Sequence, residues 1–465
     1  MKPFAYMAFV LMGIAIFICG PARADSRIVS QTEQQISIGE NMQLTINTGM
    51  IEVLELHADA GENSKKIELA FIRIQRGSKP GKSAHLILAG GPGDSGVKLV
   101  QDMVQQGGAD FMQIFDADII GIDQRGTGKS IPNLASDVRY ELPLDQPASP
   151  ELWLPIIEQA NAKVAASFRS KGIRLEAYNT RESADDVDDI RQALGYEKLT
   201  LWGRSYGSHL ALAVLRQHST SIERMVLVSP EGPNHTWKLP SQADVVLHTL
   251  SERMNEPDLF ALMQSVMRRL KKTPVKVEVV DPASNSNTSV VIGALDLQLL
   301  TIQALGNPRA IQTLPAAYRK MAGGDFSAIA PLVLMYRKQL GVQSAMKQMM
   351  DLSSGASAER RLRIKSEAQD SVLGMAFNFP TMYLADIWKP EDLGDEFRAA
   401  VASDVPTMIL VGELDPRTPV ANAREIAATL PNAKIEVIQN AAHQFDLFGS
   451  PQLREKLIAF LKSGK

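Results

Sequence analysis

The sequence Gly203-Arg204-Ser205-Tyr206-Gly207 places a serine between two glycines where one hydrophobic pattern gives way to another. The apolar run before it, residues 198–202, is typical of a buried strand, and residues 208–218 have the spacing of a helix. A Gly-x-Ser-x-Gly sequence between a strand and a helix indicates a sharp turn with the serine held in a strained conformation at its apex. The glycines are needed because strand and helix approach too closely for side chains there. The competing interpretation is an ordinary Gly/Ser turn.

Strands and helices alternate on both sides of this turn. We expect strands at 85–89, 117–123, 198–202, 225–229, 407–411 and 434–438, and helices at 183–194, 420–430 and 451–461. Ser183 is the expected N-cap of its helix, and Gly195 its stop. Such alternation predicts a mostly parallel twisted sheet with helices on both faces. Residues 42–75 alternate apolar and polar side chains and predict antiparallel strands ahead of it.

A different pattern separates the two halves of this sheet. Helical runs dominate between residues 233 and 395, at 243–254, 258–271, 296–305 and 327–340, with one hairpin at 275–291. A helical insertion between two halves of one sheet is a cap. We therefore expect an α/β fold in which residues 25–232 and 396–465 form the core and residues 233–395 form a helical cap.

The first 24 residues have the pattern of an export signal. Lys2 precedes an apolar run over 4–18, and Ala22-Arg23-Ala24 is a small-x-small cleavage site, so we expect cleavage after Ala24. The run is too short to predict a stable membrane span. The only cysteine, Cys19, lies within the signal, and a bulky Ile18 disfavours lipid attachment there. The mature chain is therefore expected in the periplasm or outside the cell, without disulfides.

Composition and spacing exclude several kinds of partner. The formal net charge is −3, and removing Lys2 and Arg23 takes two positive charges away and leaves −5. No long basic run is present, which argues against nucleic acid as a partner. No pair of histidines has metal-ligand spacing with carboxylate support, so we predict neither a metal nor another cofactor. The sequence does not determine the oligomeric state.

Residues 126–130, Gly-Thr-Gly-Lys-Ser, resemble the end of a phosphate-binding loop. That motif requires a glycine five positions before Gly128, where Asp123 stands instead. We therefore expect residues 123–126 to brace the floor of the site, with Arg125 buried and paired.

A serine hydroxyl needs a base, and the base needs a group that orients it. Asp415 and His443 each follow directly after an expected strand, and Glu231 follows another. The carboxyl ends of parallel strands meet at one edge of a sheet, so these loops are expected to converge on Ser205. The alternatives are that Asp415 only caps the next helix, that Glu231 is the acid, or that His443 is a surface residue.

A tetrahedral intermediate also needs two preorganised N–H donors. The amide of Tyr206, next to the expected nucleophile, is one candidate. The other is Gly91 in the sequence Ala89-Gly90-Gly91-Pro92-Gly93, which follows the first expected parallel strand. Glycine lets the backbone approach a substrate closely, although a plain turn remains the alternative.

Taken together, the chain resembles the α/β-hydrolase serine peptidases of the prolyl aminopeptidase and tripeptidyl aminopeptidase type. The matching motifs lie at residues 90–96, 123–130, 183–186, 203–207 and 412–419, in the family's order. The resemblance implies Ser205 as nucleophile, Asp415 as acid and His443 as base, with Gly91 and Tyr206 as oxyanion donors. It also implies release of short N-terminal units from peptides through an acyl-enzyme. Glu231 is a candidate for binding the free amine of the substrate.

The chain departs from that family's pattern at three positions. Ala89 replaces a histidine, Arg204 replaces a small residue, and Ala442 replaces a glycine. None of these changes removes a member of the expected triad. They leave open a periplasmic carboxylesterase or amidase of the same fold that needs no free amine. A binding protein with an inactive hydrolase site is a further reading, which the intact Ser, Asp and His argue against.

Overall fold

The computed structural model describes residues 27–463 apart from 39–41, 60, 62, 76–80, 113 and 116. The expected export signal and its cleavage site after Ala24 lie outside the described residues. Within the described ranges, no helix has both the length and the apolar character that crossing a bilayer requires.

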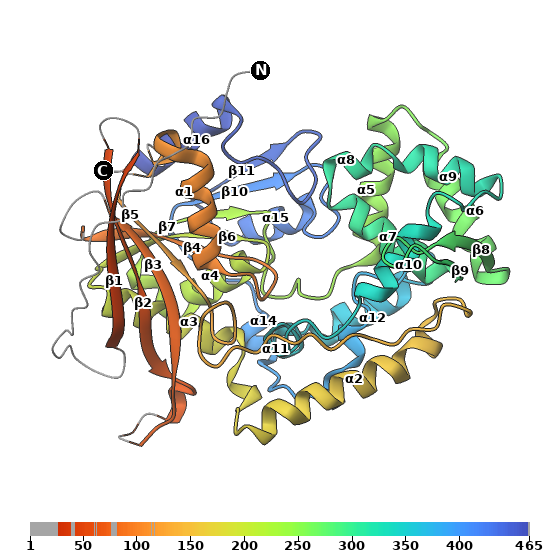
Figure 1. The fold of residues 1–465 in the computed structure, drawn as a ribbon. Helices are drawn as coiled ribbons and strands as arrows, with labels where there is room; N and C mark the ends of the chain where they lie inside the picture. The colour runs from red at the N-terminus through yellow and green to blue at the C-terminus, as the bar shows by residue number, and fades with distance from the viewer. Residues whose placement is uncertain are drawn as a thin grey trace.

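One large sheet dominates the described part of the chain (Figure 1). It contains β1 (Arg27–Ile38), β2 (Met42–Leu54), β3 (Lys66–Gln75), β4 (Ser83–Leu88), β5 (Asp118–Ile122), β6 (Lys198–Arg204), β7 (Ile222–Val228), β10 (Thr407–Gly412) and β11 (Ala433–Ile438). The order of these nine strands is β1-β2-β3-β5-β4-β6-β7-β10-β11. The first three pairs in this order, β1–β2, β2–β3 and β3–β5, are antiparallel. The remaining five pairs are parallel. The predicted mostly parallel sheet is confirmed.

The apolar–polar pattern of the sequence does not predict β1. This strand pairs only with β2, at the edge of the sheet, and most of its described side chains are exposed. No buried face imposes an apolar–polar alternation on it, so the pattern used to find the other strands is missing.

Helices cover both faces of the sheet. On one face, side chains such as Ile87 and Trp202 pack with α1 (Gly96–Met112) and α16 (Pro451–Lys462). On the other, their neighbours Leu86 and Leu201 pack with α3 (Thr180–Ala193), α4 (Tyr206–His218) and α15 (Val420–Ala427). Successive strand residues point to opposite faces, so two apolar faces require two helical layers.

The predicted N-cap of α3 is wrong by four residues. The N-cap is Asn179, not Ser183, and its side chain accepts a hydrogen bond from the amide of Glu182 at 3.1 Å. Asparagine is as good an N-cap as serine, and Asn179 has the extended backbone that the position requires, with φ −130°. Ser183 lies inside the helix.

Residues 233–395, which we call the intervening segment, add no described strand to the large sheet. Their elements are α5 (Pro240–Arg253), α6 (Leu259–Lys272), the hairpin of β8 (Val275–Val280) and β9 (Asn287–Ile292), α7 (Ala294–Leu305), α8 (Pro308–Ile311), α9 (Leu314–Ala322), α10 (Ala330–Gln339), α11 (Ala345–Ser354), α12 (Ala358–Glu367) and α13 (Ala385–Trp388). Helix α2 (Pro150–Ser170) precedes the segment, and α14 (Gly394–Arg398) ends it. In Figure 1, α5 to α10 gather to one side of the sheet. The boundaries of a separate cap stay a prediction.

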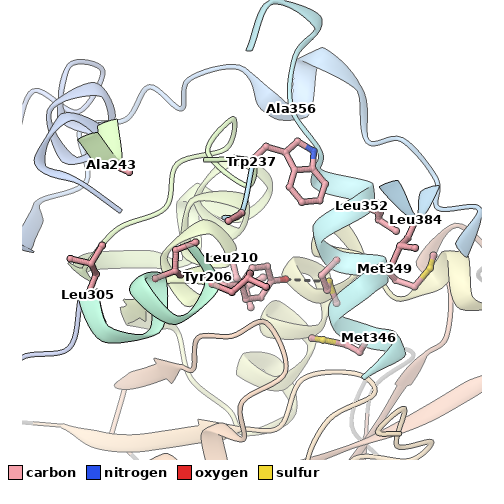
Figure 2. Packing of buried hydrophobic residues seen from close by; sticks show 14 of the residues in the cluster. Tyr206, Leu210, Trp237, Ala243, Leu305, Met346, Met349, Leu352, Ala356 and Leu384 are labelled. Carbon is pink, nitrogen blue, oxygen red and sulfur yellow. Dashed lines mark hydrogen bonds between the residues drawn. The ribbon is translucent and has the colours of Figure 1, made fainter. Parts of the chain in front are cut away.

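The intervening segment shares its apolar core with the helix behind Ser205. In Figure 2, α11 lies beside Tyr206 and Leu210 of α4, while Met349 and Leu352 are on the side of α11 that is turned away from them. The Tyr206 hydroxyl donates a hydrogen bond to Met350 Sδ of α11 at 3.2 Å, and all five of these side chains are buried in one hydrophobic cluster. Interiors of this kind are close-packed and resist small displacements. The position of α11 is therefore coupled to the start of α4.

The prediction that Arg125 is buried and paired is confirmed. Its guanidinium is fully buried and donates two hydrogen bonds to Asp186 of α3, at 2.7 and 2.8 Å, and others to the backbone carbonyls of Leu54 and Ala177. The neighbouring Asp123 accepts a hydrogen bond from the amide of Lys129 at 2.8 Å. The loop that resembles a phosphate-binding motif thus binds a carboxylate of the chain itself.

Candidate active site

Ser205 stands at the junction of β6 and α4 with φ 52° and ψ −123°, a conformation that non-glycine residues rarely adopt. A Cβ atom on Gly203 would lie 2.5 Å from the carbonyl oxygen of Gly207, and one on Gly207 would lie 2.1 Å from that of Leu88. Side chains at these two positions would therefore collide with backbone. The strained serine turn predicted from the sequence is confirmed.

Asp415 lies in the loop after β10 and is completely buried. One carboxylate oxygen accepts the backbone amides of Arg417 and Thr418 at 2.9 and 3.0 Å, and the other accepts the Thr418 hydroxyl at 2.7 Å. Burial alone would raise the pKa of Asp415, but the charge of His443 and these hydrogen bonds bring it below its ordinary value. The carboxylate is therefore ionised at neutral pH.

His443 joins the acid to the serine. Its Nδ1 lies 2.8 Å from Asp415 Oδ2, and its Nε2 lies 3.1 Å from Ser205 Oγ. The Ser229 hydroxyl donates a hydrogen bond to the His443 carbonyl at 3.0 Å and ties this loop to the end of β7. The structure thus brings together three side chains that are far apart in the sequence.

The sequence analysis missed the contribution of Thr418 to this arrangement. Its hydroxyl contacts both Asp415 and His443 Nδ1, the latter at 3.2 Å. The sequence Asp415-Pro416-Arg417-Thr418 is typical of a turn in which an aspartate accepts amides two and three residues later. The three-residue spacing between Asp415 and Thr418 could therefore have identified Thr418 as a hydrogen-bond partner of Asp415.

The two predicted oxyanion donors lie on either side of Ser205. Tyr206 is the first residue of α4, where backbone amides have no partner within the helix. Gly91 has φ 107°, which favours glycine, and a Cβ atom on its neighbour Gly90 would lie 3.3 Å from Ser205 Cβ. The glycine loop therefore passes directly beside the serine, as two converging donors require.

A cavity of about 1020 Å³ opens onto Ser205 and His443. Its wall also includes Glu231 and, from the intervening segment, Asp351. Both carboxylates are paired with lysines, as Lys238 Nζ lies 2.5 Å from Glu231 and Lys347 Nζ lies 2.6 Å from Asp351. Burial by itself would raise the pKa of Glu231, but Lys238 and His209 lower it overall. The predicted amine-binding carboxylate thus lies in the cavity with its charge already matched by a lysine.

The described residues hold no group of three or more His, Cys, Asp or Glu placed to ligate a metal ion.

A serine, a histidine and an aspartate on loops that follow the strands of a mostly parallel sheet, in this chain order, define an α/β hydrolase. The sequence profile of the family described as the alpha/beta hydrolase fold matches residues 86–449, and the chain belongs to this family.

Within this family, the chain has distant homologues among peptidases. It is 30% identical over 177 residues to a tripeptidyl aminopeptidase of Streptomyces lividans, across 37% of this chain and 33% of that protein. It is 28% identical over 240 residues to the serine protease Hip1 of Mycobacterium tuberculosis, across 50% of this chain and 45% of that protein. The matched stretches therefore span between a third and a half of these relatives. A solved proline iminopeptidase-related protein of Thermus thermophilus aligns over 93% of this chain and 97% of its own, with 18% identity and a TM-score of 0.37.

Proposed function

We propose that the chain is a serine hydrolase that releases short N-terminal units from peptides. The observation that carries this proposal is the position of His443, within hydrogen-bonding distance of Ser205 Oγ on one side and Asp415 on the other. The tripeptidyl aminopeptidase and the serine protease among the relatives support peptides as the substrate class.

The geometry supports an acyl-transfer mechanism in two halves. Ser205 Oγ attacks the scissile carbonyl carbon while His443 Nε2 accepts the hydroxyl proton, and Asp415 holds the ring and stabilises its positive charge. The amides of Gly91 and Tyr206 would donate to the developing oxyanion. Collapse breaks the C–N bond, and His443 passes its proton to the leaving amine. A water molecule then attacks the acyl-enzyme by the same proton route and regenerates Ser205.

Recognition of a free N-terminal amine requires acceptors in the cavity. Glu231 is our candidate carboxylate, and Gln348 Oε1, also in the cavity wall, is buried with no hydrogen-bond partner among the described residues. An unsatisfied buried acceptor is costly, which favours a ligand that donates N–H groups.

A second candidate function is a carboxylesterase or amidase with no amine requirement. The pairing of Glu231 and Asp351 with lysines favours it, because neither carboxylate is left uncompensated.

An amino-acid or tripeptide arylamide and its N-acetylated form separate these two functions. We expect the free-amine substrate to have a kcat/KM at least about tenfold higher, because an ammonium–carboxylate hydrogen bond contributes about 1.5–3 kcal/mol. The measurement is release of the arylamine by each substrate under identical conditions. Equal values for the two forms would reject the aminopeptidase and support the amidase or esterase.

We also propose that the enzyme is exported, with a mature chain that begins at Asp25. The support is the sequence pattern of residues 1–24. Expression of the full chain in a Gram-negative host should place the protein in the periplasmic fraction, where N-terminal sequencing should read Asp25 first. An uncleaved chain in the cytosol would reject this proposal.

A further inference from the structure

Two arginines in the wall of the cavity form no ion pair with any described residue. Arg204 comes from the end of β6, next to Ser205, and Arg417 from the loop that holds Asp415. Throughout the described ranges, neither guanidinium has a carboxylate within 4.0 Å or a side-chain hydrogen bond. The three lysines of the wall differ, since Lys98, Lys238 and Lys347 are each paired with a carboxylate. The cavity that opens onto Ser205 and His443 therefore has two guanidinium groups in its wall that are not ion-paired with any described residue.

Both arginines are only partly accessible to water. Residues of the intervening segment enclose Arg417. A Cβ atom on Gly306, just after α7, would lie 3.7 Å from Arg417 Nε, and Tyr336 of α10 lines the same cavity. Burial lowers the pKa of both guanidinium groups, while the charge of Asp415 raises it in part. An arginine stays charged at neutral pH in spite of such shifts, and the described carboxylates compensate its lost hydration only in part, with no direct hydrogen bond.

We propose that Arg417, assisted by Arg204, binds a carboxylate group of the substrate and so selects peptides that carry a carboxylate within reach of this part of the cavity wall. This inference rests on the proposed function, because it assigns a substrate class to the same cavity. A planar guanidinium with unused donors matches a carboxylate in a two-point hydrogen-bonded pair, which is among the stronger polar contacts in proteins. Two sources supply this chemistry: an acidic side chain of the peptide, or the free C-terminal carboxylate of a short one.

Binding to a catalytically inactive chain tests this inference without requiring turnover. The Ser205→Ala protein is titrated by calorimetry with the amidated peptides Ala-Ala-Glu and Ala-Ala-Gln, and with Ala-Ala-Gln as the free acid. We expect at least one carboxylate-bearing peptide to bind about tenfold or more tightly than amidated Ala-Ala-Gln. The tighter peptide identifies the source of the carboxylate. Raising the salt concentration should reduce the difference, because charge pairs are screened.

Adding Arg417→Met to this protein should remove the difference, whereas adding Lys98→Met should keep it. Lys98 is the matched control because it is also a cation of the cavity wall but is paired with Asp102 and largely exposed. Arg417→Lys keeps the positive charge but lacks the planar guanidinium, so it should retain part of the preference for carboxylate-bearing peptides. This second variant keeps the test informative if Arg417→Met fails to fold. Equal affinities, no binding of any peptide, or a preference that survives Arg417→Met would overturn the inference. Covalent labelling of Ser205 in the unmodified chain decides the proposed function separately.

Discussion

Replacing Ser205 with alanine should lower kcat by about 10,000-fold to 1,000,000-fold, the range found when a nucleophile that acts within a triad is removed. In the proposed mechanism the Ser205 hydroxyl forms the acyl-enzyme, and it is the group that lies 3.1 Å from His443 Nε2. The backbone strain at this position, with φ 52°, is the same for alanine, so the fold should be retained. The measurement is hydrolysis of the free-amine arylamide, with circular dichroism to show that the variant is folded.

A fluorophosphonate probe gives a readout of the same residue that needs no knowledge of the substrate. The unmodified chain should be labelled at Ser205, and the Ser205→Ala variant should not be labelled. Ser167→Ala is the matched control, because Ser167 is exposed on α2 and its loss should change neither labelling nor turnover. Failure of the folded chain to react at Ser205 would mean that the hydrolase site is inactive, and the binding-protein reading would then stand.

The parts of this site that the sequence predicts are those tied to local pattern. Ser205 follows β6 directly, Asp415 and His443 lie three and five residues after the ends of β10 and β11, and the ends of parallel strands meet at one edge of the sheet. Their convergence therefore follows from the order of strands and loops. Glycine spacing adds the strained turn, because Gly203 and Gly207 are needed only if strand and helix are in close contact.

The parts that the sequence does not predict depend on contacts between distant elements. Lys347 and Asp351 are one turn apart on α11, but nothing in their spacing shows that α11 lines the cavity. The free guanidinium of Arg417 is likewise visible only once every nearby carboxylate has been placed. Pattern rules describe single elements, whereas the charge balance of a cavity is a property of the packed whole.

Asp415→Asn should lower kcat at neutral pH by about 10,000-fold, as removal of the acid does in other Ser-His-Asp enzymes. In the structure, the Asp415 carboxylate accepts the two backbone amides through Oδ1 and faces His443 Nδ1 with Oδ2. An asparagine that keeps its oxygen on the amides must turn its NH₂ group toward His443. The ring then carries its proton on Nε2, where it points at Ser205 and cannot act as a base.

The same substitution should have a pH-dependent effect on stability. The pKa of Asp415 is lowered in the folded chain, so its ionised form stabilises the fold above the unfolded-state pKa of about 3.9, and this contribution is lost as pH falls through the lower, folded-state value. The difference in unfolding free energy between the unmodified chain and Asp415→Asn, from urea denaturation, should thus be larger at pH 7 than at about pH 3.5. Asp404→Asn, at an exposed residue shortly before β10, should show little change at either pH.

If Asp415→Asn instead kept kcat within about tenfold, the orienting acid would have to be another carboxylate. Glu231 is the sequence's other candidate, and its pairing with Lys238 argues against that outcome.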